Sequence, residues 1–220
     1  APEPDAPLTV LAEGLGFVVV DKPAGVAVHP LAPGEGGTLA NAVVARYPEC
    51  AGASPEPREG GAVQRLDLET SGCVLFARDP SAWQALHEQL GARGVEKVYR
   101  ALVVGKVVAG GVSSVPLAQR GGKAVPVPDT LAEERARSKG LKPRPAETTW
   151  EVERRFAGHT LLRVGITTGV MHQIRAHLAH AGYPVAGDAL YGGASAALPG
   201  LGRHFLHAAP RATRAPLNYG

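Results

Sequence analysis

Apolar positions recur with a period of two, or in short buried runs, at five places that predict β-strands. The runs cover residues 17–20, 73–77, 97–104, 148–154 and 160–167. Within 97–104 the alternation places Tyr99 on the same face as Ala101 and Val103. A turn at Ala157-Gly158 separates the last two runs, so the economical interpretation is an antiparallel hairpin.

Helical spacing of apolar residues appears in three further segments. Thr38 is a suitable N-cap for a short helix that ends before Pro48, and Asp79-Pro80 opens a second helix that closes at Gly91 and Gly94. The third helix runs from residue 171 to 181 and ends at Gly182. In that helix His172 and Arg175 are three residues apart and therefore share a face.

The order of these elements predicts the fold class. Strands and helices mix without a regular βαβ alternation, and no internal repeat is evident. We expect a single α+β domain over residues 1–220, with a largely antiparallel mixed sheet flanked by helices. Three segments are expected to lie outside regular structure: a loose lead-in at 1–14, a loop at 51–61 and a basic, irregular segment at 119–147.

Composition narrows the class of protein. No run of about 18 apolar residues exists to cross a bilayer, and no secretory signal is visible, so we expect a cytoplasmic protein. The two cysteines, Cys50 and Cys73, are too few for a disulfide scaffold and lack the paired spacing of a zinc site. Residues 1–92 carry five basic and 12 acidic side chains, whereas residues 93–220 carry 18 basic and eight acidic side chains. Charge alone leaves a polyanion-binding surface and a solvated face equally open.

An ordered series of motifs is the strongest functional signal. An aspartate in a turn is usually a cap or a turn former, but Asp67 lies within VQRLDLETSG, residues 63–72. The other motifs are VVDKPAG at 19–25 with His29-Pro30, KVYRALVVG at 97–105, HQIRAHL at 172–178 followed by GDALYG at 187–192, and LHA at 206–208. Together they resemble the RluA-type pseudouridine synthases over nearly the whole chain.

The resemblance implies a reaction and its catalytic residues. Enzymes of this type isomerise uridine in RNA without a cofactor or metal: the N-glycosidic bond breaks, the uracil turns, and C5 joins the same sugar carbon. Asp67 matches the catalytic carboxylate, as nucleophile or as base. Arg175 matches the arginine that pairs with it, and Tyr99 matches the tyrosine that stacks on the base and helps to remove the C5 proton.

The same resemblance implies contacts with RNA. Arg65 matches a residue that helps to hold the RNA around the flipped nucleotide, although a salt bridge to Glu69 or Asp67 is an alternative. We also assign Gln64, His172 and Gln173 to RNA binding. The expected partner is ribosomal or transfer RNA, bound by a monomer without a separate N-terminal RNA-binding domain.

Two departures from the family pattern point to altered target preference rather than lost chemistry. Gln64 stands where His is usual, and Gly169-Val170-Met171 stands where Gly-Arg-Thr is usual. Two other function classes compete: a non-catalytic RNA-binding protein that keeps the fold, and a metal-dependent hydrolase that uses the histidines. Retention of Asp67 weighs against the first, and the spacing of His172, His177 and His180 does not gather them on one helix face.

Overall fold

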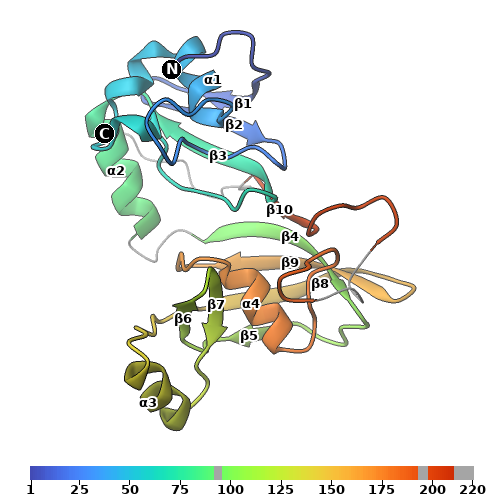
Figure 1. The fold of residues 1–220 in the computed structure, drawn as a ribbon. Helices are drawn as coiled ribbons and strands as arrows, with labels where there is room; N and C mark the ends of the chain where they lie inside the picture. The colour runs from blue at the N-terminus through green and yellow to red at the C-terminus, as the bar shows by residue number, and fades with distance from the viewer. Residues whose placement is uncertain (92–95, 193–197, 211–220) are drawn as a thin grey trace.

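A single eight-stranded sheet runs through the protein (Figure 1). The computed structural model describes residues 1–91, 96–192 and 198–210. The strands follow the order β1-β2-β3-β10-β4-β9-β8-β5. Their bounds are β1 Thr9–Glu13, β2 Phe17–Lys22, β3 Ser71–Ala77, β10 Leu206–Ala208, β4 Lys97–Val104, β9 His159–Ile166, β8 Thr148–Phe156 and β5 Gly111–Ser113.

Helices flank this sheet, as the sequence predicts. They are α1 Leu39–Arg46, α2 Pro80–Gly91, α3 Thr130–Ser138 and α4 Gln173–His180. Thr38 caps α1 in a capping box with Asn41, and the Asp79 carboxylate accepts a hydrogen bond from the Ala82 N–H at the start of α2. The predicted α+β domain with a mixed, mostly antiparallel sheet is confirmed.

The short strand β10 joins the two halves of the sheet. It pairs in parallel with β3 and antiparallel with β4, and the other pairs among the described strands of this sheet are antiparallel. Gly72 makes the junction possible: its φ is +114°, and a Cβ there would lie 2.2 Å from the Ala208 carbonyl oxygen. Separate apolar cores lie on either side of this junction, one around Phe76 and one around Leu162.

Three predictions about irregular segments need correction. Residues 9–13 of the expected lead-in form β1, which pairs with β2. The expected irregular segment 119–147 contains most of the hairpin β6 Leu117–Arg120 and β7 Lys123–Pro126, followed by α3, which Asp129 caps. Most residues of α3 are exposed, and β6 and β7 are only four residues each, so these pieces show little of the apolar pattern on which the prediction depended. Two 3₁₀ helices, Pro48–Gly52 and Pro57–Glu59, interrupt the expected loop 51–61.

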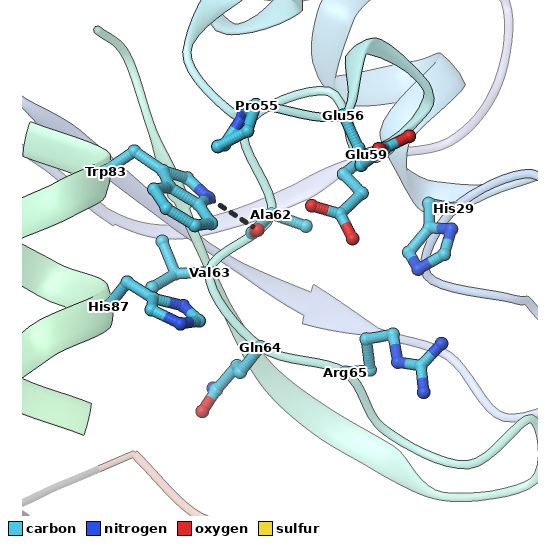
Figure 2. A pocket seen from close by; sticks show the side chains of 10 residues that line it. All are labelled: His29, Pro55, Glu56, Glu59, Ala62, Val63, Gln64, Arg65, Trp83 and His87. Carbon is cyan, nitrogen blue, oxygen red and sulfur yellow. Dashed lines mark hydrogen bonds between the residues drawn. The ribbon is translucent and has the colours of Figure 1, made fainter. Parts of the chain in front are cut away.

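The predicted hairpin is confirmed, because β8 and β9 pair across Ala157-Gly158. Gly94, expected to end the second helix, lies outside the described residues. Among the residues that the structure describes, no helix combines the length and the hydropathy needed to cross a membrane. A pocket of about 410 Å³ opens beside α2 and the segment 62–65 (Figure 2).

Candidate active site

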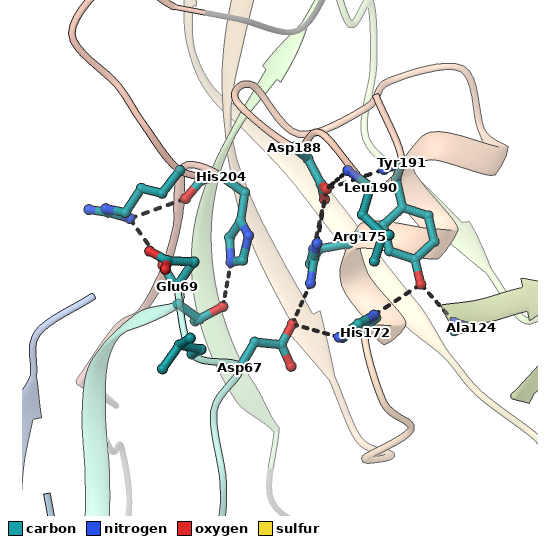
Figure 3. A network of polar contacts seen from close by, with 12 residues as sticks. Asp67, Glu69, Ala124, His172, Arg175, Asp188, Leu190, Tyr191 and His204 are labelled. Carbon is teal, nitrogen blue, oxygen red and sulfur yellow. Dashed lines mark hydrogen bonds and ion pairs between the residues drawn. The ribbon is translucent and has the colours of Figure 1, made fainter. Parts of the chain in front are cut away.

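Asp67 lies on the loop before β3 and meets Arg175 of α4, 108 residues later in the chain (Figure 3). The Arg175 Nη1 donates to the Asp67 Oδ2 at 2.9 Å. The arginine side chain is 8% exposed and the aspartate side chain 26%. A charge-assisted hydrogen bond to a nearly buried partner fixes the direction of the carboxylate and leaves part of it accessible to a ligand.

Asp188 holds the other edge of the same guanidinium. Its Oδ2 accepts from the Arg175 Nε at 2.7 Å, and its Oδ1 accepts from the Arg175 Nη2 at 2.9 Å and from the backbone N–H groups of Leu190 and Tyr191. Burial raises the pKa of Asp188, but the hydrogen bonds and charge of Arg175 outweigh burial, and the net pKa lies below its usual range. Arg175 is therefore locked in place before any substrate arrives.

His172 and Tyr191 form a second contact with this network. The His172 Nδ1 lies 3.2 Å from the Tyr191 hydroxyl, which itself accepts from the Ala124 N–H at 2.7 Å. The His172 Nε2 lies 3.8 Å from the Asp67 Oδ2. His172 has a φ of +54°, and it is the one residue other than glycine with a positive φ in the described part of the chain. A left-handed backbone conformation costs free energy in a residue other than glycine. Here it turns the imidazole toward the carboxylate of Asp67.

Tyr99 approaches from the sheet. It lies on β4, between Ala208 of β10 and Val164 of β9, and is 8% exposed. Burial raises the pKa of its phenol, and the negative charge of Asp67 raises it further. The phenol is therefore neutral at neutral pH, and Tyr99 presents an aromatic ring close to Asp67.

Lys22 supports the loop that carries Asp67. It ends β2, is 0% exposed, and its Nζ donates to three carbonyl oxygens, those of Pro23, Val26 and Leu68, at 2.7 to 2.9 Å. Burial lowers the pKa of this amine to about 8. The Leu68 carbonyl oxygen also accepts from the Gly25 N–H at 2.9 Å. These bonds tie the loop to the N-terminal half of the sheet.

His204 supports the same loop from the C-terminal side. It is 5% exposed, and its Nε2 lies 2.8 Å from the Thr70 Oγ1. Burial lowers the pKa of His204 from 6.5 to about 4. At neutral pH the imidazole is therefore buried in its neutral form.

This buried imidazole makes the fold sensitive to acid. Below about pH 6.5 the unfolded chain binds a proton at His204 and the folded chain does not, so this residue lowers the free energy of unfolding by up to about 3 kcal/mol between pH 7 and pH 4. Urea unfolding at both pH values measures the loss. His204→Gln, which keeps a polar head but does not titrate, should lose correspondingly less, and an equal loss in both proteins would contradict this role.

The residues predicted to contact RNA occupy different environments. Arg65 is exposed and forms no ion pair with a described residue, so the alternative salt bridge to Glu69 or Asp67 is not formed. The Gln64 Nε2 donates to the Cys73 carbonyl oxygen at 3.3 Å, and both Gln64 and Arg65 line the pocket beside α2. His172 faces Asp67, with its Nε2 3.8 Å from the Asp67 Oδ2, and its side chain is only 17% exposed.

Gln173 does not fit the predicted RNA contact and is reassigned to a structural role. It is 3% exposed, its amide oxygen accepts from Thr168 and Val170, and its amide nitrogen donates to Glu147 and Thr148. These bonds join α4 to β8 and leave no polar atom facing solvent. Val170 is also buried and packs in a cluster with Leu117, Ala124 and Ala176.

The histidines that suggested a metal site form separate hydrogen bonds. His177 contacts Thr148 and the Val115 carbonyl oxygen, and the His207 Nδ1 lies 3.0 Å from the Ser71 hydroxyl. Within residues 1–91, 96–192 and 198–210, no group of three His, Cys, Asp or Glu side chains is placed to hold a metal ion.

The structure pairs Asp67 with Arg175, as the sequence predicts, and places Tyr99 near them. The sequence analysis gave no role to four further residues of this region: Asp188, Tyr191, Lys22 and His204. Asp188 lies in the GDALYG motif. The sequence feature that could have indicated its importance is the neighbouring glycine, Gly187. Gly187 has a φ of +78°, and a Cβ there would lie 2.0 Å from the Arg203 carbonyl oxygen. A glycine under that constraint marks a loop held tightly against the segment before β10.

The comparisons with known proteins agree on one family. The family model for RNA pseudouridylate synthase matches residues 16–180. A ribosomal large subunit pseudouridine synthase D of Xanthomonas campestris pv. campestris is 42% identical over 93% of this chain and 61% of its own length. An uncharacterized RNA pseudouridine synthase of Chloroflexus aurantiacus is 43% identical over 86% of this chain and 56% of its own length. The chain thus spans about three fifths of the curated relatives it matches.

Solved structures show the same fold. The structure of human RNA pseudouridylate synthase domain containing 1 superposes with a TM-score of 0.72 at 24% sequence identity, over 94% of this chain and 79% of that one. The human domain containing 4 gives a TM-score of 0.67 at 22% identity, over 91% and 82%.

Proposed function

Because the chain belongs to the RNA pseudouridylate synthase family, we propose that it isomerises uridine to pseudouridine in RNA, with Asp67 as the catalytic carboxylate. The observation that carries this proposal is the Asp67–Arg175–Asp188 network: a partly accessible carboxylate held by an arginine that is itself locked. A protein that only bound RNA would have no need of a carboxylate oriented in this way.

The reaction moves one bond within a single nucleotide. The bond between N1 of uracil and C1′ of ribose breaks, C5 forms the new bond to C1′, and the C5 proton leaves while N1 gains a proton. Asp67 either attacks the sugar as a nucleophile or removes a proton from it as a base, and both roles require a carboxylate directed at the ribose. Arg175 supplies that direction from behind.

Tyr99 fits two roles in the second half of the reaction. Its ring offers a stacking surface that holds the freed uracil while it turns. Because the charge of Asp67 contributes to the raised pKa of Tyr99, any step that neutralises Asp67 lowers the pKa of the phenol. The phenol then loses its proton more easily, and the resulting phenolate is the form of Tyr99 that can take the C5 proton once the new C–C bond has formed.

We propose ribosomal RNA of the large subunit as the substrate, because several curated relatives are named for it. The test is pseudouridine mapping of total RNA from cells with and without the gene. Loss of a discrete site in large-subunit ribosomal RNA, restored by the wild-type gene and not by Asp67→Asn, is the expected result. If the lost site lies in transfer RNA instead, the substrate is transfer RNA and not ribosomal RNA. If no site is lost, the result favours the alternative of a non-catalytic RNA-binding protein.

The segment 117–144, which contains β6, β7 and α3, offers exposed cations to the RNA. Arg135 and Arg144 are exposed and form no ion pair with a described residue, and the Lys123 Nζ donates to the Leu190 carbonyl oxygen beside the active site. If both arginines contact phosphates, Arg135→Gln with Arg144→Gln should flatten the dependence of log Kd on log salt by about 1.4.

RNA-binding titrations over a range of salt concentrations measure this slope. The matched control is Arg46→Gln with Arg58→Gln, two exposed arginines of the acidic N-terminal half. The control should keep the wild-type slope. An unchanged slope in the Arg135 and Arg144 variant would remove this segment from the RNA interface.

A further inference from the structure

The pocket beside α2 lies next to the active site but is not part of it (Figure 2). Its volume of about 410 Å³ is within the range of small-ligand sites. Asp67, Tyr99 and Arg175 do not line it. The segment 62–65 forms one wall, and Asp67 follows Arg65 by two residues, so their Cα atoms are at most about 7 Å apart. A ligand in this pocket is therefore close to a uridine at Asp67.

One wall of the pocket is aromatic. Trp83 and His87, one turn apart on α2, stack with ring centroids 4.5 Å apart and planes 12° from parallel. The Trp83 Nε1 donates to the Ala62 carbonyl oxygen at 3.1 Å, which fixes the indole against the adjoining segment 62–65 (Figure 2). A fixed indole stacked on an imidazole is a platform suited to another flat ring.

His29 contributes a buried polar atom without a partner. The residue is 7% exposed, and its Nδ1 lies 3.0 Å from the Pro30 carbonyl oxygen. A carbonyl oxygen only accepts, so Nδ1 carries a proton, and in that tautomer Nε2 is an acceptor. This Nε2 is buried and has no hydrogen-bond partner among the described residues. A buried acceptor left unpaired is costly and indicates a ligand that donates to it.

Two charged side chains complete the pocket. The Glu59 carboxylate points into the hollow, and the Arg65 guanidinium lies across from it near His29 (Figure 2). Neither side chain forms an ion pair within the described part of the chain. With Glu56 also on the lining, the pocket has two carboxylates and one arginine, which does not suit a phosphate group. It suits a neutral ring that both donates and accepts hydrogen bonds.

We propose that this pocket binds an unpaired guanine of the RNA, close in the strand to the target uridine. Guanine presents two N–H donors on one edge, for the Glu59 carboxylate and the His29 Nε2, and two acceptors, O6 and N7, for Arg65. Its ring stacks on Trp83. The inference rests on the proposed function for its ligand, RNA, and adds a second base-recognition site that reads sequence beside the modified uridine.

The test compares four fluorescein-labelled hexaribonucleotides, oligouridine and the same chain with G, A or C at its third position. Binding to the 220-residue protein is followed by fluorescence anisotropy. The G-containing RNA should bind about tenfold more tightly than oligouridine, the effect of one stacked and hydrogen-bonded base. In a Trp150→Phe background, where Trp83 is the remaining tryptophan, unlabelled G-containing RNA should also quench its fluorescence more strongly.

Matched variants locate the effect. Glu59→Gln and Trp83→Ala should each reduce the preference for G toward unity, whereas Trp83→Phe, which keeps an aromatic ring, should retain most of it. Circular dichroism checks that each variant is folded. If Trp83→Ala is not folded, the preference for G in Glu59→Gln tests the proposal. Equal affinity for all four RNAs, a preference for another base, or a G preference that survives Glu59→Gln would overturn the proposal.

The outcome is separable from that of the proposed function. Asp67→Asn should keep the preference for G, because Asp67 does not line the pocket. Pseudouridine formation without any G preference would remove this inference alone. A G preference in a protein that makes no pseudouridine would leave the pocket standing and remove the proposed reaction.

Discussion

Asp67→Asn should reduce pseudouridine formation by at least about 10⁴-fold while the protein stays folded and still binds RNA. Asparagine has nearly the volume of aspartate and can still accept a hydrogen bond from Arg175, so the network around it changes little. It cannot attack the sugar or take a proton from it, so the chemical step is lost. Release of the C5 hydrogen from labelled uridine in the mapped RNA measures the rate.

The control for this variant is Glu69→Gln, which removes a carboxylate two residues away on the same loop. Its rate should stay within a few fold of the wild type, because Glu69 does not contact Arg175. Turnover retained by Asp67→Asn would refute the role of Asp67. Equal losses in both variants would mean that the negative charge of the loop matters, rather than one reacting group.

Asp188→Asn should lower the free energy of unfolding by about 3–5 kcal/mol, although Asp188 is not expected to touch the substrate. The side chain of Asp188 is 0% exposed and that of Arg175 is 8% exposed. Loss of the Asp188 charge leaves a buried guanidinium whose one anionic partner among the described residues is the partly accessible Asp67. Urea unfolding at neutral pH measures the loss, and activity should fall as well because Arg175 is no longer held.

A double-mutant cycle separates this explanation from a general packing defect. In an Arg175→Met background the buried positive charge is gone, so Asp188→Asn should cost much less than it does alone. Full additivity of the two substitutions would show that the two side chains do not depend on each other, and the locked arginine would lose its importance for the site.

Local signals in the sequence were enough for most helices and long strands. The capping residues Thr38 and Asp79 predict the starts of α1 and α2. The alternation of apolar residues around Tyr99 and Leu162 predicts the buried faces of β4 and β9. The elements that were missed have weak local signals. In β1 most residues are exposed, and Ala136 is the one buried residue of α3. Their structure depends on neighbours distant in sequence.

The candidate site divides in the same way. Motif resemblance identified Asp67, Arg175 and Tyr99, whereas Asp188 reads in the sequence as an ordinary turn residue. Its role appears only when the chain folds back 13 residues to face Arg175. The prediction for Gln173 differs from the structure in the opposite direction. A polar residue beside His172 suggested contact with RNA, but the side chain points inward and its amide atoms are hydrogen-bonded within the protein. Polarity in a motif does not reveal which way a helix faces.

The central position of β10 sets the order in which this molecule can be completed. Hairpins such as β8–β9 close over two residues, but Ser71 of β3 meets His207 of β10 across 136 residues. During synthesis the two halves can form their local pairings before β10 emerges, because β10 follows both of them in the chain. Thr70 meets His204 only once this later segment is present. A chain that has not been synthesised as far as β10 therefore lacks contacts that hold the loop of Asp67.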